Sequence, residues 1–183
     1  MTAPASVTVE PLGLPGLSLL RGVRHHDDRG FLRKVVVLEE ARRQGVDIVV
    51  DEVVSTANDV AGTVRGMHYQ VRPFEETKTL WVTSGAIVDV LVDLRSDQPT
   101  YGLWVSVRLS ADDDVALHVP PGLAHGYQTL ADDTTLTYLM SGAFSAEHAR
   151  TLAWDDPTVG IDWPLPVTRI SEKDRHGHPW PSA

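Results

Sequence analysis

The stretch TKTLWVTSGAIVDVLVDL, residues 77–94, consists of two apolar runs separated by the dipeptide Ser84-Gly85. Both runs are rich in residues that favour β-strands, and each has the length of a typical strand. Serine and glycine are common in tight turns. The stretch therefore predicts a strand over Thr77–Thr83, a turn, and a second strand over Ile87–Leu94.

The second of these strands carries an acidic residue among apolar ones. Side chains alternate between the two faces of a strand, so the three valines share one face while Asp89 shares the other with Ile87 and Leu91. An acidic side chain in a largely apolar strand is costly to bury unless it has a partner. We expect that partner to be a histidine.

Similar apolar runs continue on both sides of this pair. They predict further strands over Ile48–Ser55, Trp104–Leu109, Val115–Val119, Tyr127–Leu130 and Thr135–Met140. Short strands at close spacing, separated by Gly, Pro and Asp turns, are typical of an antiparallel sandwich or barrel. No linker or internal repeat interrupts them. We therefore expect a single all-β domain over residues 1–183.

The remaining segments predict little regular structure. Pro11–Leu20 begins with turn residues and continues into a strand, and Asp27–Gly30 is a turn. Leu38–Gly45 is the only good helical pattern, and Gly45 would end the helix. The segment from Asp155 onward is rich in proline and charge. We expect it to wrap around the surface.

Composition excludes several classes of protein. The 183 residues carry a formal net charge of -9, whereas proteins that coat nucleic acid usually present a basic face. The chain has no cysteine, which excludes disulfides, thiolate ligands and cysteine nucleophiles. No apolar run approaches the roughly 20 residues of a membrane helix, and Met1–Val9 lacks the pattern of a signal peptide. We expect a cytoplasmic protein that binds neither membranes nor nucleic acid.

The segment RGMHYQ, residues 65–70, places Arg65 close to His68, and Lys78 follows shortly afterwards. Histidine can accept a proton near neutral pH. Arginine offers a planar fork that suits phosphate, and lysine a compact charge. This combination indicates proton abstraction from a phosphorylated substrate. A structural histidine, hydrogen-bonded within a sheet, is the alternative.

Three other residues are candidates on weaker grounds. His125 follows PPGLA, residues 120–124, a rigid turn that would position its imidazole or merely give it one backbone hydrogen bond. Tyr138 lies on an apolar face of its strand, where it could pack in the core or donate a phenolic proton. Asp174 lies in the charged tail, and its interest depends on whether it reaches His68.

The sequence predicts neither a metal nor a cofactor. His176 and His178 have the spacing of metal ligands, but they lie in a polar, proline-flanked tail. No glycine-rich phosphate loop is present, so a bound nucleotide would be held by side chains.

Several collinear segments carry a family resemblance. They are Asp27-x-Arg29-Gly30, GTVRGMHYQ (62–70), Lys78, GAIVDVLVDLR (85–95), VPPGLAHGY (119–127), Tyr138, WDDPTVGIDWP (154–164) and ISEKD (170–174). Together they span most of the chain and resemble the dTDP-4-dehydrorhamnose 3,5-epimerase family. That resemblance implies a cofactor-free epimerase with a cupin-type double-stranded β-helix, a jelly-roll barrel with a few short helices. It also implies a homodimer in which each subunit completes the other's site.

The resemblance implies a role for each candidate. His68 would be the base, oriented by Asp174, and Tyr138 the acid on the opposite face of the sugar. Lys78 would stabilise an enolate. The residues expected to bind the substrate are Arg65, Arg29, His125, Asp89, Phe144 and His25. A ketone at C4 of a dTDP-4-keto-6-deoxyhexose acidifies the hydrogens on C3 and C5. Reprotonation from the other face would then invert the centre in a step of deoxysugar biosynthesis.

The chain also departs from the family pattern. Phe144 stands where many members carry a second tyrosine, which favours inversion at one centre only. Lys34, His25 and the segment Val50–Asp59 differ in the region expected to bind the nucleotide. Two alternatives stay open: a 4-keto-sugar ketoisomerase, and a cupin that binds a nucleotide sugar without turnover.

Overall fold

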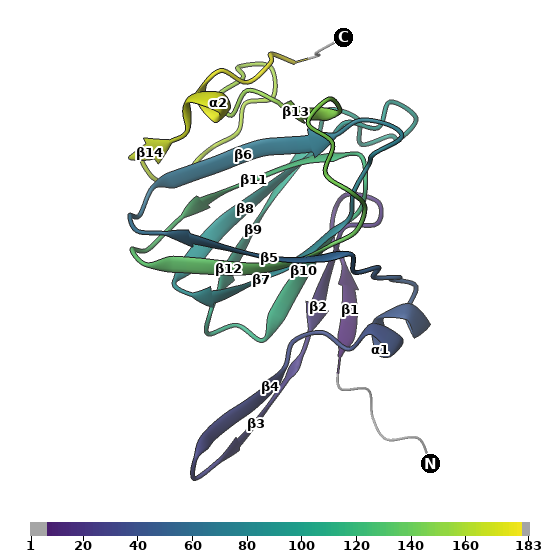
Figure 1. Ribbon diagram of the computed structural model, residues 1–183, viewed down its shortest axis with the longest axis vertical. Helices are drawn as coiled ribbons and strands as arrows, with labels where there is room; N and C mark the ends of the chain where they lie inside the picture. The colour runs from purple at the N-terminus through teal and green to yellow at the C-terminus, as the bar shows by residue number, and fades with distance from the viewer. Residues whose placement is uncertain (1–6, 181–183) are drawn as a thin grey trace.

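The computed structural model describes residues 7–180, so both ends of the predicted 1–183 domain, including the start of the Met1–Val9 segment, lie outside the description. Strands dominate the described part of the chain (Figure 1). In chain order the elements are β1 (Thr8–Pro11), β2 (Ser18–Arg21), β3 (Val23–Asp27), β4 (Gly30–Lys34), α1 (Leu38–Arg43), β5 (Glu52–Asn58), β6 (Thr63–Gln70), β7 (Lys78–Ser84), β8 (Ala86–Asp93), β9 (Trp104–Ser110), β10 (Val115–Val119), β11 (Leu123–Thr129), β12 (Thr134–Met140), β13 (Ala149–Thr151), β14 (Arg169–Ile170) and α2 (Glu172–Arg175).

The strands form two main sheets that face each other. The first has the order β1-β2-β10-β7-β12-β5, and the second has the order β13-β6-β11-β8-β9, with β14 added beside β6. The main pairings are antiparallel, and β14 joins β6 in parallel. Figure 1 shows the two sheets enclosing a barrel-like interior, with β6 and β5 on opposite sides of its opening. This is the predicted all-β, cupin-type jelly roll.

Apolar side chains from both sheets fill much of this interior. Leu80 and Leu136 of the first sheet pack in one cluster with Ile87 and Leu91 of the second, and all four are fully buried. Burial of such side chains stabilises the fold by about 1.5–3 kcal/mol each relative to leaving them exposed. Asp89, which alternation places with Ile87 and Leu91, therefore also faces the interior.

The outer face of the second sheet is covered as well. Val90 and Val92 of β8 are fully buried there, in a cluster with Leu152 and Val159 of the C-terminal segment. Both faces of β8 are thus covered, which explains why its sequence is an almost continuous apolar run. The segment after Asp155 wraps around the surface, as the sequence predicted, and it also leads the chain past β6 to α2 (Figure 1).

The hairpin of β3 and β4 stands apart from the barrel (Figure 1). Its tip is the predicted Asp27–Gly30 turn. Phe31 and Leu32 on β4 are 57% and 61% exposed, which is unusual for large apolar side chains. The hairpin thus presents an apolar surface that this chain leaves uncovered.

Most of the predicted strand ranges agree closely with the observed strands. The ranges Thr77–Thr83, Ile87–Leu94, Trp104–Leu109, Val115–Val119 and Thr135–Met140 match β7, β8, β9, β10 and β12 to within about one residue. Gly85, between β7 and β8, has a φ of +73°, and a Cβ there would lie 2.2 Å from Thr134 Oγ1. The turn between the two strands therefore requires glycine at this position.

Three ranges were wrong at their boundaries. The predicted strand Ile48–Ser55 is replaced by β5, which begins at Glu52, because Ile48 packs with Ala41 of α1 instead of pairing in the sheet. The strand predicted over Tyr127–Leu130 begins earlier, at Leu123, immediately after the glycine turn. The helix predicted over Leu38–Gly45 ends at Arg43, and Gly45, with a φ of +89°, terminates it just after the C-cap Gln44, as predicted. Within residues 7–180, neither helix is long enough to cross a membrane.

Candidate active site

A histidine and an aspartate meet at the junction of β6 and α2. Nε2 of His68 lies 2.6 Å from Oδ1 of Asp174. Asp174 is 4% exposed and is held in place by Ser171, whose Oγ accepts a hydrogen bond from the Asp174 backbone N–H at 3.1 Å and caps the helix. A carboxylate can only accept, so the proton of this pair resides on Nε2. The lone pair of Nδ1 is then available as a base.

The surroundings of Asp174 favour its charged form. Burial by itself raises the pKa of this carboxyl. The hydrogen bond and charge of His68, the Gly66 N–H and the Ser171 hydroxyl outweigh burial, so the pKa lies below its usual value. Asp174 is therefore an anion at neutral pH, and it stabilises an imidazolium on His68 once that ring accepts a proton.

Gly66 is required by the same junction. Its N–H donates to Oδ2 of Asp174 at 3.1 Å. Its φ is +130°, and a Cβ at this position would lie 2.5 Å from the Cα of Gly126. Only glycine can meet both conditions, so β6 approaches β11 closely just where the carboxylate is bound.

A second pair of the same chemistry lies beside the first. His125 on β11 is directly opposite His68 on β6, so both imidazoles face the barrel interior. Nε2 of His125 lies 2.9 Å and 3.0 Å from the two carboxylate oxygens of Asp89. A histidine therefore partners the aspartate of β8, as the sequence predicted. Burial raises the pKa of Asp89, and the nearby His125 and Lys78 only partly oppose this.

Tyr138 faces these histidines from the opposite sheet. Its ring centroid lies 6.3 Å from that of His125, in an edge-to-face arrangement. The residue is 7% exposed and belongs to the interior cluster. Burial raises the pKa of its phenol well above the usual value, and Tyr127 and Asp89 add to this effect. The phenol is therefore protonated at neutral pH and can donate a proton.

Lys78 is the first residue of β7, and its side chain lies on the same face of the sheet as Tyr138. It shares a face of the strand with Leu80, which pairs directly with Tyr138. The Lys78 side chain is 10% exposed, and Nζ lies 2.9 Å from Oε1 of Glu76. The nearly buried ammonium group of Lys78 therefore belongs to the residue next to Leu80 on that face, and Leu80 is the cross-strand partner of Tyr138.

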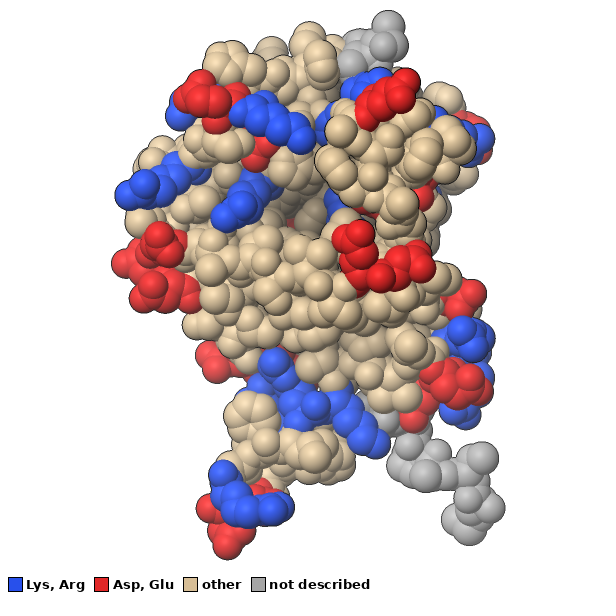
Figure 2. All heavy atoms as spheres, in the orientation of Figure 1, with Lys and Arg blue, Asp and Glu red and all other residues tan. Residues whose placement is uncertain are grey.

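Arg65 stands at the opening of the barrel. Its Nε donates to Oδ1 of Asn58 at 2.7 Å and its Nη2 to the carbonyl of Ala57 at 3.1 Å, so it bridges β6 and β5. Figure 2 shows that the surface is hollowed between these two strands and that basic side chains gather on the β6 side of the hollow. An anionic ligand that enters the interior would pass this guanidinium.

The other three predicted residues lie elsewhere in this chain. His25 and Arg29 are exposed on the β3–β4 hairpin, and Arg29 pairs with Asp27 at its tip. Phe144 is 66% exposed in the loop between β12 and β13. The first two therefore do not join His68 and Tyr138 within one chain, because the hairpin projects away from the barrel (Figure 1).

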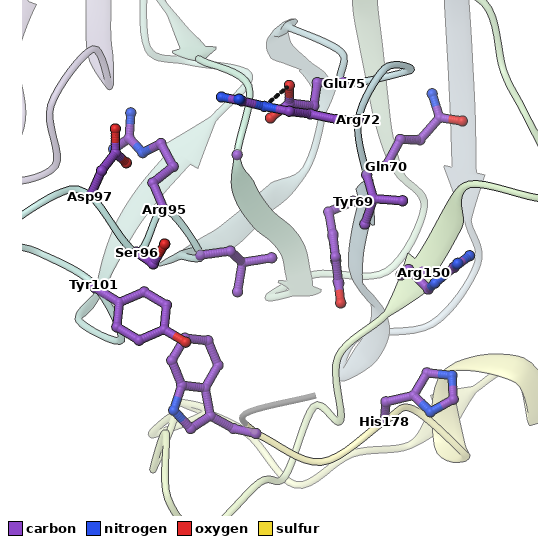
Figure 3. A pocket seen from close by; sticks show the side chains of 14 residues that line it. Tyr69, Gln70, Arg72, Glu75, Arg95, Ser96, Asp97, Tyr101, Arg150 and His178 are labelled. Carbon is purple, nitrogen blue, oxygen red and sulfur yellow. Dashed lines mark hydrogen bonds and ion pairs between the residues drawn. The ribbon is translucent and has the colours of Figure 1, made fainter. Parts of the chain in front are cut away.

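A cavity of about 670 Å³ lies apart from these groups, and we call it the tail pocket. Figure 3 shows aromatic and basic side chains around it, among them Tyr69, Tyr101, Arg95, Arg150 and His178. None of His68, Lys78, His125 or Tyr138 lines it. Tyr69 neighbours His68 in β6 and therefore points to the other face of the sheet. The chemically competent groups thus belong to the barrel interior and not to this cavity.

Sequence reasoning missed three residues that contact the site. Tyr127 approaches Tyr138, and its hydroxyl lies 3.1 Å from Thr56 Oγ1. Glu76 pairs with Lys78, and Gln70 donates to Glu76 Oε2 at 3.0 Å. The two-residue spacing of Glu76 and Lys78 could have indicated a shared side of the chain. No signal in the sequence indicated the other two contacts. Among residues 7–180, no three His, Cys, Asp or Glu side chains are grouped so as to hold a metal ion.

Comparisons with known proteins agree on one family. The profile of the dTDP-4-dehydrorhamnose 3,5-epimerase family matches residues 11–181. The chain is 40% identical over 166 residues to the dTDP-4-dehydrorhamnose 3,5-epimerase of Sinorhizobium fredii, covering 90% of this chain and 85% of that protein. It is 37% identical over 170 residues to the Pseudomonas aeruginosa enzyme, covering 91% and 92% of the two chains.

Solved structures give the same result. The dTDP-4-dehydrorhamnose 3,5-epimerase of Bacillus anthracis, crystallised with TDP and PPi, superposes with a TM-score of 0.91 at 35% identity, covering 94% of this chain and 99% of that one. ChmJ, a 3'-monoepimerase from Streptomyces bikiniensis in complex with dTDP-quinovose, gives a TM-score of 0.86 at 31% identity, covering 92% and 86%. This chain therefore belongs to the dTDP-4-dehydrorhamnose 3,5-epimerase family.

Proposed function

We propose that this epimerase inverts C3, C5 or both in a dTDP-4-keto-6-deoxyhexose, as a step of deoxysugar biosynthesis. The observation that carries the proposal is the pairing of His68 with Asp174 on one sheet and the presence of Tyr138 on the other. A base and an acid on opposite sides of one interior are what inversion of a carbon centre requires. Relatives crystallised with TDP and with dTDP-quinovose support a dTDP-linked substrate.

The reaction begins with removal of a proton next to the ketone. His68 accepts the proton from C3 or C5, and the electron pair moves through the new carbon–carbon double bond to O4. Asp174 stabilises the imidazolium that results. General base catalysis by a positioned histidine contributes about 10²–10⁴-fold to the rate.

The enolate is stabilised and then protonated from the other face. Lys78 provides a positive charge near O4 in a sheltered interior, where such a charge is more effective than in water. Tyr138 donates its phenolic proton to the same carbon from the opposite side, which inverts the centre. The phenolate and the imidazolium return to their starting states by exchange with solvent.

We assign substrate-binding roles to the remaining predicted residues. Arg65, at the opening of the barrel, would bind a phosphate of the nucleotide, and the His125–Asp89 pair would hydrogen-bond the sugar. Phe144 keeps an aromatic ring without a hydroxyl, which favours inversion at a single centre. Position and residue chemistry support the assignments of Arg65 and of the His125–Asp89 pair, whereas residue chemistry alone supports that of Phe144.

We also propose that the protein is a homodimer whose β3–β4 hairpin completes the partner's site. The hairpin exposes Phe31 and Leu32, and it carries His25 and Arg29 away from their own barrel. An apolar surface of this kind is typical of an interface. A second copy would bring the imidazole of His25 and the guanidinium of Arg29 to a nucleotide. The cytoplasmic location stays a prediction.

Hydrogen exchange with solvent tests the activity directly. The protein is incubated with dTDP-4-keto-6-deoxyglucose in heavy water, and deuterium at C3 and C5 is followed by NMR. We expect exchange at one or both carbons, and exchange at one carbon alone would identify a mono-epimerase. His68→Ala should reduce the rate of exchange by at least about a hundredfold.

The same measurement separates the alternatives. A product with its ketone at C3 would identify a ketoisomerase. Binding of the nucleotide sugar without exchange at either carbon would identify a binding protein and would refute the proposed reaction.

A further inference from the structure

Among the proposed catalytic residues, Lys78 has the longest and most flexible side chain, with its ammonium at the end of a four-carbon stem. Stabilisation of an enolate depends on a fixed charge, since a group displaced by about 1 Å can lose as much as a hundredfold in rate. The surroundings of Lys78 therefore have to hold its ammonium in place.

Glu76 contacts that ammonium directly. Its Oε1 lies 2.9 Å from Lys78 Nζ, and the two side chains are 11% and 10% exposed. Most of the ion pairs within residues 7–180 are far more open, such as Arg72–Glu75 in the same loop, where the arginine side chain is 88% exposed. A nearly buried pair is weakly screened by solvent, so it restricts the lysine more than a surface pair would.

Gln70 holds Glu76 in turn. Its Nε2 donates to Oε2 of Glu76 at 3.0 Å and to the carbonyl of Phe74 at 2.9 Å. Gln70 is 5% exposed, and Figure 3 shows its side chain directed away from the tail pocket. Each carboxylate oxygen of Glu76 thus has its own partner: Oε1 contacts the ammonium of Lys78, and Oε2 accepts from the side-chain amide of Gln70. The carboxylate cannot turn away from Lys78 without losing both contacts.

Gln70 also contacts a second loop. Its Oε1 accepts from the Ser145 N–H at 2.7 Å, and its Nε2 lies 3.3 Å from the carbonyl of Ala143. These two residues flank Phe144. One buried amide, two residues after His68 in β6, therefore links the loop that carries Glu76 to the loop that carries Phe144.

From these contacts we infer that Glu76 and Gln70 are positioning residues, which fix the ammonium of Lys78 and couple it to the 143–145 loop. The inference rests on the proposed role of Lys78. Glu76 acts through Lys78 and does not itself touch the substrate. Gln70 acts through Glu76 and through the backbone around Phe144.

Kinetics of Glu76 variants test the inference. Glu76→Ala should lower kcat by about tenfold to a hundredfold and change KM by less than about threefold, because it disturbs transition-state stabilisation more than binding. Glu76→Gln should restore kcat to within about threefold of the wild type or above it, since the amide oxygen can still accept from the ammonium. Glu75→Ala is the matched control, because it removes the neighbouring acidic side chain from an exposed pair, and it should leave both constants unchanged.

A double-mutant cycle shows whether Glu76 acts through Lys78. In a Lys78→Ala background, Glu76→Ala should cause no further loss of kcat. An equal loss in both backgrounds, or a Glu76→Ala enzyme as active as the wild type, would overturn the inference. A wild-type protein without turnover would instead contradict the proposed reaction, so the two failures are distinguishable.

Gln70 requires a different measurement. Gln70→Ala should lower kcat and also raise KM, because it releases the 143–145 loop as well as Glu76. Thermal unfolding of the same variant checks that the barrel remains folded. A normal KM in a folded Gln70→Ala enzyme would contradict the link between the two loops.

Discussion

Two aspartates each stand behind a histidine, yet their surroundings shift their pKa values in opposite directions. The carboxylate of Asp174 accepts from His68 and the Gly66 N–H, and these contacts, with the nearby Ser171 hydroxyl, lower its pKa in spite of burial. Asp89 is fully buried, and the effect of burial outweighs His125, Lys78 and the Val90 N–H, so its pKa is raised. The first pair is therefore suited to stabilising an imidazolium that forms during the reaction, and the second is better suited to hydrogen bonding.

Asp174→Asn tests this difference. It removes the charge while keeping a side chain of similar shape, and an amide can stabilise the wrong tautomer of His68. We expect kcat to fall by about 10²–10⁴-fold, measured as the rate of deuterium exchange. The matched control is Asp156→Asn, since Asp156 is 4% exposed and accepts from the backbone amides of Thr158 and Trp180 but contacts no histidine. A control as impaired as Asp174→Asn would show that the effect is only structural.

At the scale of the element, residue patterns predicted most strands of the two main sheets but missed β6, where Arg65 and Gly66 interrupt the apolar pattern, and both strands of the hairpin. β12 alternates, and β8 and β10 are largely apolar, because both strands lie inside the covered sheets. β3 and β4 are exposed along most of their length, so no apolar pattern marks them. Ile48 was assigned to a strand because its apolar side chain is compatible equally with a sheet and with the face of α1, and only tertiary packing decides between them.

In the candidate site, too, local sequence patterns predicted some contacts, while others depend on tertiary packing. The cost of burying Asp89 predicted a histidine partner without further information. The approach of Asp174 to His68 joins positions 106 residues apart, and only the family resemblance suggested it. The contacts of Glu76 and Gln70 depend on how two loops close against each other, which local pattern does not encode.

The β3–β4 hairpin allows a test of the proposed dimer. Phe31→Asp combined with Leu32→Asp should disrupt the proposed dimer, because it places charges on an apolar interface. We expect a monomer in analytical ultracentrifugation and a KM raised by at least about tenfold, with the thermal stability of the barrel little changed. The control is Val53→Asp, a substitution at another exposed apolar residue, 67% exposed and outside the hairpin. Wild-type protein that sediments as a monomer would refute the dimer.

At the scale of the whole molecule, we expect the free energy of unfolding to depend on pH because of His118, which lies in the middle of the first sheet. Its Nδ1 is 2.9 Å from Thr79 Oγ1, and burial lowers the pKa of its imidazole to about 4. The unfolded chain, with a histidine pKa near 6.5, binds this proton more readily than the folded one. The stability of the fold therefore falls as the pH falls from about 6.5 to about 4, by on the order of 3 kcal/mol.

Urea unfolding at several pH values between about 7.5 and 4.5 measures this loss. His118→Asn should unfold with a weaker dependence on pH over that interval, whereas His26→Asn, a change on the exposed hairpin, should follow the wild type. Identical pH profiles for wild type and His118→Asn would show that another group is responsible.

The position of Asp174 in α2 separates the completed His68–Asp174 pair from the strands that build the barrel. Both sheets are largely assembled from residues that precede β13, whereas the carboxylate beside His68 comes from α2. A cut in the chain between β13 and α2 would therefore leave almost every strand of the two main sheets on one fragment, while the carboxylate that orients His68 would be on the other.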